Sequence, residues 1–141
     1  MIIPDVNVLV YAYNPNARHH EAARLWWEHA ISGGCGIGLP WAVILGFIRL
    51  TTSKSVMVNP IAVTQACGAV REWLGQPNVT ILNPGPSHAE ALFSILAEMG
   101  TGGNLTTDAH LATLAMEFHG ELVSNDADFA RIKGLRWARP F

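Results

Sequence analysis

The chain has 141 residues, a formal net charge of −2 and an apolar share of 50%, so we expect a single domain over residues 1–141 with a self-sufficient core. The charge excludes a broad basic nucleic-acid surface, and the two cysteines exclude a disulfide framework. With no apolar run near the roughly 20 residues of a membrane span, we expect a soluble, cytoplasmic protein with Cys35 and Cys67 as buried thiols.

Hydrophobic periodicity predicts strands and helices that alternate along the chain. Strands are expected over Ile2–Pro4, Cys35–Leu39, Val79–Leu82 and Leu122–Ser124, with an edge strand over Leu135–Ala138. Helices are expected over His20–Ser32, Trp41–Leu50, Asn59–Leu74, Ser87–Met99 and Thr106–Phe118, with a helical turn over Ala127–Ile132. This alternation favours an α/β fold, a three-layer α/β/α arrangement around a mostly parallel sheet of four or five strands.

Several details of the helices follow from their composition. Trp41–Leu50 is almost wholly apolar, which predicts a helix buried nearly all round. Gly46 inside it indicates that another element approaches the backbone closely. Asn59 with Pro60 reads as a helix start, and Ser87 with Glu90 as a capping box. The five Trp are either core residues or surface that a partner covers.

The placement of aspartate is the main functional signal. Only four Asp occur: Asp5 after the first strand, Asp108 in the first turn of a helix that Thr106 or Thr107 caps, and Asp126 and Asp128 after the fourth strand. The carboxyl ends of parallel strands share one edge of a sheet, so these acids are expected to converge. Taken singly, Asp108, Asp126 and Asp128 read equally well as helix caps or first-turn acids. No clear helix start follows Asp5.

Clustered carboxylates repel one another unless they are protonated or bound to a cation. A hard divalent ion suits them, because Mg²⁺ prefers oxygen ligands and retains several waters. Such an ion can generate hydroxide from bound water and neutralise a phosphodiester. Neighbouring polar side chains are candidates to orient ligands or waters, and they are Asn7, Asn104, Thr107, Ser124 and Asn125.

Three segments resemble the acidic motifs of the PIN-domain family in order and spacing: Asp5-Val6-Asn7, Asn104–Ala112 and Val123–Ala130. The similarity extends over essentially the whole chain and is greatest to the toxins of VapBC-type toxin-antitoxin modules. It implies an endoribonuclease dependent on Mg²⁺ or Mn²⁺, dimeric and held inactive by a cognate antitoxin. Together with the acid placement, it makes Asp5, Asp108 and Asp126 the expected metal ligands and Asp128 an auxiliary catalytic acid.

One position departs from the family pattern. Many members have a Glu several residues before an Arg in the helix that corresponds to Trp41–Leu50, and Gly46 or a neighbour stands there before Arg49. The fourth acid is therefore missing. This keeps open the alternative of a PIN-like module that binds RNA or protein without cutting. A Mg²⁺-dependent phosphotransferase or phosphatase is disfavoured, because no second Asp stands two residues after Asp5.

Basic residues near the acids offer contacts for a substrate. Arg131 and Lys133 follow Asp126 closely, and Arg49 is expected to join them in space. Phosphate contacts of this kind position a strand without reading its sequence. The expected partners are thus RNA, an antitoxin and a second copy of the chain.

Overall fold

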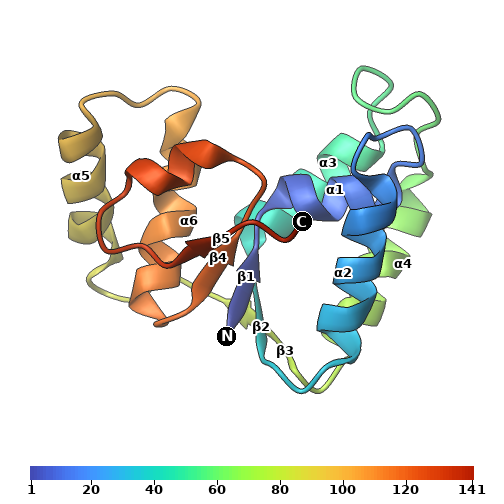
Figure 1. Ribbon diagram of the computed structural model, residues 1–141, viewed down its shortest axis with the longest axis horizontal. Helices are drawn as coiled ribbons and strands as arrows, with labels where there is room; N and C mark the ends of the chain where they lie inside the picture. Colours follow the sequence, from blue (N-terminus) through green and yellow to red (C-terminus); the bar gives the residue numbers. More distant parts are fainter.

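The computed structural model describes residues 1–141, and a five-stranded parallel sheet lies at its centre (Figure 1). The strands are β1 (Ile2–Pro4), β2 (Ile37–Pro40), β3 (Val79–Leu82), β4 (Glu121–Val123) and β5 (Trp137–Ala138), in the order β3-β2-β1-β4-β5. Every neighbouring pair is parallel, and Pro4 pairs with Val123 in register. The expected α/β class is confirmed.

Helices cover both faces of the sheet and complete the three layers. They are α1 (Val6–Tyr13), α2 (His20–Ser32), α3 (Trp41–Thr51), α4 (Val63–Leu74), α5 (His88–Met99), α6 (Leu105–Glu117) and a 3-10 helix, η1 (Ala127–Arg131). In Figure 1, α5 and α6 lie on one side of the strands, and α1 to α4 lie on the other. None of the helices combines the length and apolar character needed to span a bilayer.

An aromatic cluster joins the four helices of the larger layer. Trp73 of α4 packs against Phe47, Trp27 and Tyr13 with ring centroids 4.7, 5.2 and 5.7 Å apart. Its indole Nε1 donates a hydrogen bond to the Tyr13 hydroxyl at 3.1 Å. Trp27 and Trp73 are buried, whereas Trp41 is 48% exposed. The core interpretation therefore holds for Trp27 and Trp73, and cover by a partner stays a prediction for Trp41.

The most consequential error of prediction concerns the segment after Asp5. Val6–Tyr13 forms α1, and the Asp5 side chain caps it by accepting a hydrogen bond from the Val6 amide. The sequence hides this helix because its valines and tyrosines favour strands, so no helix is expected over this apolar run. Here tertiary packing overrides local preference, because Val8, Leu9, Val10 and Ala12 are all buried.

Other helix details also differ from expectation. Helix α3 is not buried all round, because Leu45 is 60% exposed along with Trp41. Asn59 and Pro60 do not start α4; the amide of Ala62 instead donates to Gln65 Oε1 at 3.0 Å just before Val63.

The remaining corrections concern caps and thiols. Ser87 occupies the N-cap position of α5 but makes no capping hydrogen bond, so the expected capping box does not form. Helix α6 starts one residue before Thr106, which leaves Asn104 at its N-cap position. Cys35 is exposed and Cys67 partly exposed, so the thiols are not both buried.

Gly46 explains how closely two helices approach. A Cβ atom there would lie 3.1 Å from Val6 Cγ2, tighter than an ordinary van der Waals contact. Glycine thus lets α3 pack on the first turn of α1, which confirms the expected close approach.

Candidate active site

The carboxyl ends of β1 and β4 bring distant polar residues together. The Asp5 amide donates to the Val123 carbonyl at 2.8 Å, continuing the pairing of the two strands by one residue. Asp5 and Ser124 therefore follow adjacent strands at one edge of the sheet. This is the edge where open α/β sheets form their binding crevices.

Asp5 is a buried carboxylate with two strong hydrogen bonds. It is 6% exposed, its Oδ1 accepts from the Val6 amide at 2.6 Å, and its Oδ2 accepts from Ser124 Oγ at 2.6 Å. Burial raises its pKa above the ordinary value, and the charge of Asp126 acts in the same direction, although the two hydrogen bonds oppose them. The same side chain thus caps α1 and contributes a charge to the site.

Ser124 holds this network in one arrangement. While its hydroxyl donates to Asp5, its oxygen accepts from Asn7 Nδ2 at 3.2 Å and from the Asp126 amide at 3.0 Å. Because the single hydroxyl proton is used on Asp5, Asn7 must present its amino group to Ser124. This leaves Asn7 Oδ1 buried without any hydrogen-bond partner.

The other three acids complete the cluster. Asp126 Oδ1 accepts from the Asp128 amide at 2.9 Å and so caps η1. Asp108 stands in the first turn of α6, and its pKa rises to about 6 through burial, then the charges of Asp5, Asp126 and Asp128. The four aspartates therefore lie close enough to feel one another, as their placement after strands and at a helix start predicts.

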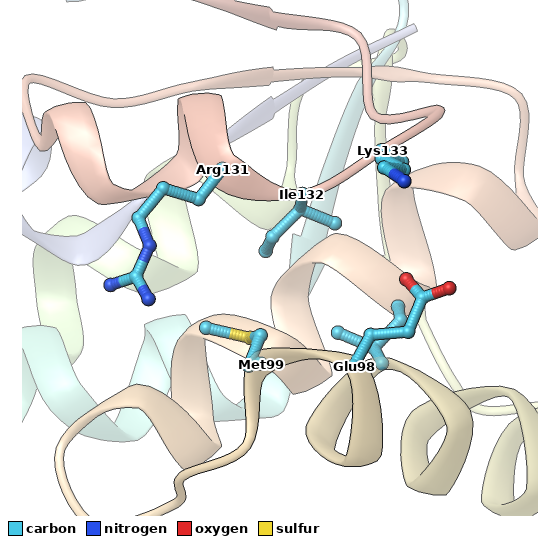
Figure 2. A pocket seen from close by; sticks show the side chains of 6 residues that line it. Glu98, Met99, Arg131, Ile132 and Lys133 are labelled. Carbon is cyan, nitrogen blue, oxygen red and sulfur yellow. The ribbon is translucent and has the colours of Figure 1, made fainter.

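Some of the other expected residues lie at the margins. Asn104 and Thr107 are exposed at the start of α6, and neither makes a side-chain hydrogen bond. Arg49 is exposed in the last turn of α3. Arg131 and Lys133 are exposed at the end of η1 and line a pocket with α5, shown in Figure 2.

The donor set suits a divalent cation held partly through water. No three His, Cys, Asp or Glu side chains are close enough to ligate one ion directly. Mg²⁺ is commonly bound through one or two carboxylates and keeps several waters, so the oxygen-only acids meet its preference. Asn7 Oδ1 supplies an unused buried acceptor beside Asp5. Burial is the main cause of the raised pKa of Asp108, and the charges of the other acids add to it; a bound cation relieves this added repulsion.

Sequence reasoning missed a hydrogen-bonded group of two histidines and a glutamate between α5 and α6. His88 Nδ1 lies 3.2 Å from Glu117 Oε2, and its Nε2 lies 2.8 Å from His110 Nδ1. Glu117 Oε1 also accepts from the Gly85 amide at 2.7 Å. Burial first, then the charge of His88, lowers the pKa of His110. No short motif reveals this group, because its members are far apart in sequence.

Comparison with known proteins identifies the family. The profile described as PIN domain matches residues 2–135. The chain belongs to the PIN-domain family. This PIN domain is 41% identical over 140 residues to ribonuclease VapC33 of Mycobacterium tuberculosis, covering 99% of this chain and 98% of that protein. That full-length identity places it among the VapC ribonucleases and confirms the expected enzyme class.

Solved structures share the fold at lower sequence identity. VapBC2 from Rickettsia felis, bound to a DNA fragment from its promoter, matches this PIN domain with a TM-score of 0.70 at 19% identity, covering 99% of this chain and 98% of that one. M. tuberculosis VapC20, titled a Sarcin-Ricin loop cleaving toxin, has a TM-score of 0.70 at 16% identity, covering 96% and 99%. These likenesses confirm the PIN-like architecture.

Proposed function

We propose that this VapC-type ribonuclease is the toxin of a toxin-antitoxin pair and cleaves RNA in the cytoplasm with a divalent cation, Mg²⁺ or Mn²⁺. The observation that carries the proposal is the convergence of four aspartates: partial burial of Asp108 and the charges of the other three raise its pKa to about 6. Such perturbed acids in a group mark candidate catalytic sites. Identity to VapC ribonucleases supports the substrate class.

Asp5, Asp108 and Asp126 would hold the cation, at least one of them through a bound water because no three carboxylates are preassembled, and Asp128 would act as an auxiliary acid. When bound, the cation makes water a better nucleophile and neutralises charge on the scissile phosphodiester. Ser124 fixes the Asp5 carboxylate through its 2.6 Å hydrogen bond, so Asp5 does not reorient during the reaction. Asn7 orients a water with its free Oδ1, and Asn104 and Thr107 supply further polar contacts at the start of α6.

Substrate phosphates contact Arg49, Arg131 and Lys133. All three are exposed and none forms a salt bridge within the protein, so their charges are available to an anion. A small set of local cations is consistent with the net charge of −2, because the protein has no general field that attracts RNA.

Cleavage of RNA in Mg²⁺ and in EDTA tests the assignment. Wild-type protein cuts only with the cation, and Asp5→Asn and Asp126→Asn lose the activity while retaining the fold by circular dichroism. Activity at the wild-type rate in either variant, or in EDTA, overturns the mechanism.

A binding module that does not cleave is the second candidate. Gly46 occupies the region where many PIN domains have an acid, and no three ligands are preassembled. Calorimetry with Mn²⁺ separates the two functions: cation uptake together with cleavage supports the nuclease, whereas absence of both supports the module.

An antitoxin and a second copy of the chain are the proposed protein partners. A structural relative from Klebsiella pneumoniae is titled a toxin-antitoxin complex, and the exposed Trp41 and Leu45 of α3 offer apolar surface for association. Light scattering of the isolated chain tests the dimer, and a monomer at high concentration refutes it. Co-purification with the product of the neighbouring reading frame tests the antitoxin.

A further inference from the structure

A pocket of about 360 Å³ opens between the C-terminal end of α5 and η1 (Figure 2). Its lining consists of Ile95, Glu98, Met99, Arg131, Ile132 and Lys133. Ile95 and Ile132 are 9% and 7% exposed, whereas the charged residues are exposed. The pocket thus has an apolar floor and a charged mouth.

The pocket adjoins the acid cluster through η1. Asp126 caps this helix, Asp128 lies in its first turn, and Arg131 is its last residue. A 3-10 helix rises about 2 Å per residue, so Asp128 and Arg131 are separated by about 6 Å along its axis. Arg131 at the pocket thus belongs to the same short helix as two of the four acids, which places the pocket beside the acid cluster.

The charges at the mouth are of both signs and unpaired. In Figure 2 the guanidinium of Arg131 lies at one end, and the carboxylate of Glu98 lies near Lys133 at the other. None of the three forms a salt bridge. The mouth therefore offers hydrogen-bond donors to an anion and a carboxylate to a donor group of the same ligand.

We propose that this pocket binds one unpaired nucleotide of the RNA next to the scissile phosphate, and that Glu98 selects bases with an exocyclic amino group. The inference rests on the proposed nuclease function. The base packs on Ile95, Met99 and Ile132, its own phosphate contacts Arg131, and Lys133 at the other end of the mouth contacts a neighbouring phosphate of the chain. Glu98 accepts a hydrogen bond from the amino group, as carboxylates do from cytosine N4.

A nucleotide fits this combination better than an acidic peptide does. A peptide rich in Asp and Glu would satisfy the two cations but would place like charges beside Glu98, which is unfavourable. A nucleotide brings its negative charge on the phosphate and its donors on the base. Single-stranded or looped RNA exposes these base edges, so the pocket favours unpaired RNA.

Binding of uridine pentamers that carry one central A, C, G or U tests the role of Glu98. Fluorescence anisotropy is measured in EDTA, where the proposed nuclease does not cleave. Wild type binds the A, C and G pentamers about tenfold more tightly than the all-U pentamer. Glu98→Gln reduces this preference to about twofold or less. Glu90→Gln retains it, because this exposed Glu of α5 does not line the pocket.

Arg131→Ala tests the phosphate contact separately. It weakens all four pentamers by a similar factor and lowers the salt dependence by about one phosphate contact. Arg71→Ala, on the exposed surface of α4, leaves both unchanged.

Three results overturn the proposal: no amino preference in wild type, a preference retained in Glu98→Gln, or equal loss in Glu90→Gln. An antitoxin peptide whose binding depends on Arg131 while RNA binding does not also overturns it, since the pocket would then belong to a protein partner. If wild type fails to cleave RNA with Mg²⁺, the proposed nuclease function is refuted instead. That result is read from the cleavage products, whereas the pocket is tested by the pentamer affinities.

Discussion

Replacing Asp108 by asparagine separates two effects of the acid cluster: the folding stability that it costs and the cation binding that it provides. The pKa of Asp108 rises from its ordinary 3.8 to about 6 in the folded protein. At about 1.36 kcal/mol for each pKa unit, this corresponds to about 3 kcal/mol against the ionised form. The side chain is only half-buried, so solvent screening reduces the cost to about 1 to 2 kcal/mol.

The sign of the effect follows from proton linkage. Below pH 3.8 Asp108 is protonated in both the folded and the unfolded protein, and it costs no stability. Between pH 3.8 and about 6 the unfolded chain loses its proton first, so the cost of folding grows. Above pH 6 the full cost is present. Asp108→Asn should therefore stabilise the metal-free protein by about 1 to 2 kcal/mol at pH 7.5, and this gain should vanish toward pH 3.8.

Urea denaturation in EDTA at pH 7.5, 5 and 4 measures this change. Glu90→Gln is the matched control, because Glu90 is an exposed acid in the first turn of α5 and lies outside the cluster. A first-turn acid normally stabilises a helix by about 0.3 to 1 kcal/mol through the helix dipole, so the control should be destabilised. If Asp108→Asn is destabilised equally, the cost attributed to burial of Asp108 and to repulsion by the other acids is refuted. Added Mn²⁺ should stabilise wild type but not the variant.

Three further predictions concern other parts of the structure. Ser124→Ala removes the hydrogen bond to Oδ2 of the buried Asp5 and leaves only the bond from the Val6 amide, and we expect the free energy of unfolding to fall by about 1 to 3 kcal/mol; an unchanged urea midpoint would contradict this. Asn7→Ala removes the unpartnered Oδ1, so calorimetry should show Mn²⁺ affinity reduced about 10- to 100-fold, and wild-type affinity would rule out its role. Trp73→Ala should cost about 3 to 5 kcal/mol in thermal or urea unfolding, but Trp41→Ala less than about 0.5 kcal/mol; similar losses would refute the difference in packing.

The sheet could be predicted closely because its strands are short apolar runs with clear ends. Ile2–Pro4 and Val79–Leu82 agree with the structure at both ends, since each is followed by a polar residue, Asp5 or Asn83. Helix α1 could not be predicted in the same way, because its residues favour strands and its signal is the cap that Asp5 provides. Asp5, the carboxylate predicted to bind a metal, is also the N-cap of this helix.

The part of the candidate site that follows from strand topology alone could be predicted from the sequence. Parallel strands end at one edge, and this rule brings Asp5 and Asp126 together without knowledge of any side chain. The orientation of Asn7 was not predictable, because it depends on a proton that Ser124 donates across 119 residues of sequence. Likewise, the sequence around Glu98 indicates only an exposed acid on a helix; its place in the same pocket as Arg131 is visible only in the structure.

The contact of Gly46 with Val6 bears on how this branch of PIN domains can evolve. The Cβ of any side chain at position 46 would lie 3.1 Å from Val6 Cγ2, so an acid there requires the Val6 side chain to move by a few tenths of an ångström. A smaller residue at position 6 would relieve this contact but would remove packing between α3 and α1. Positions 6 and 46 are therefore coupled, and we expect an acid at position 46 to be tolerated best in chains whose residue at position 6 is smaller than valine.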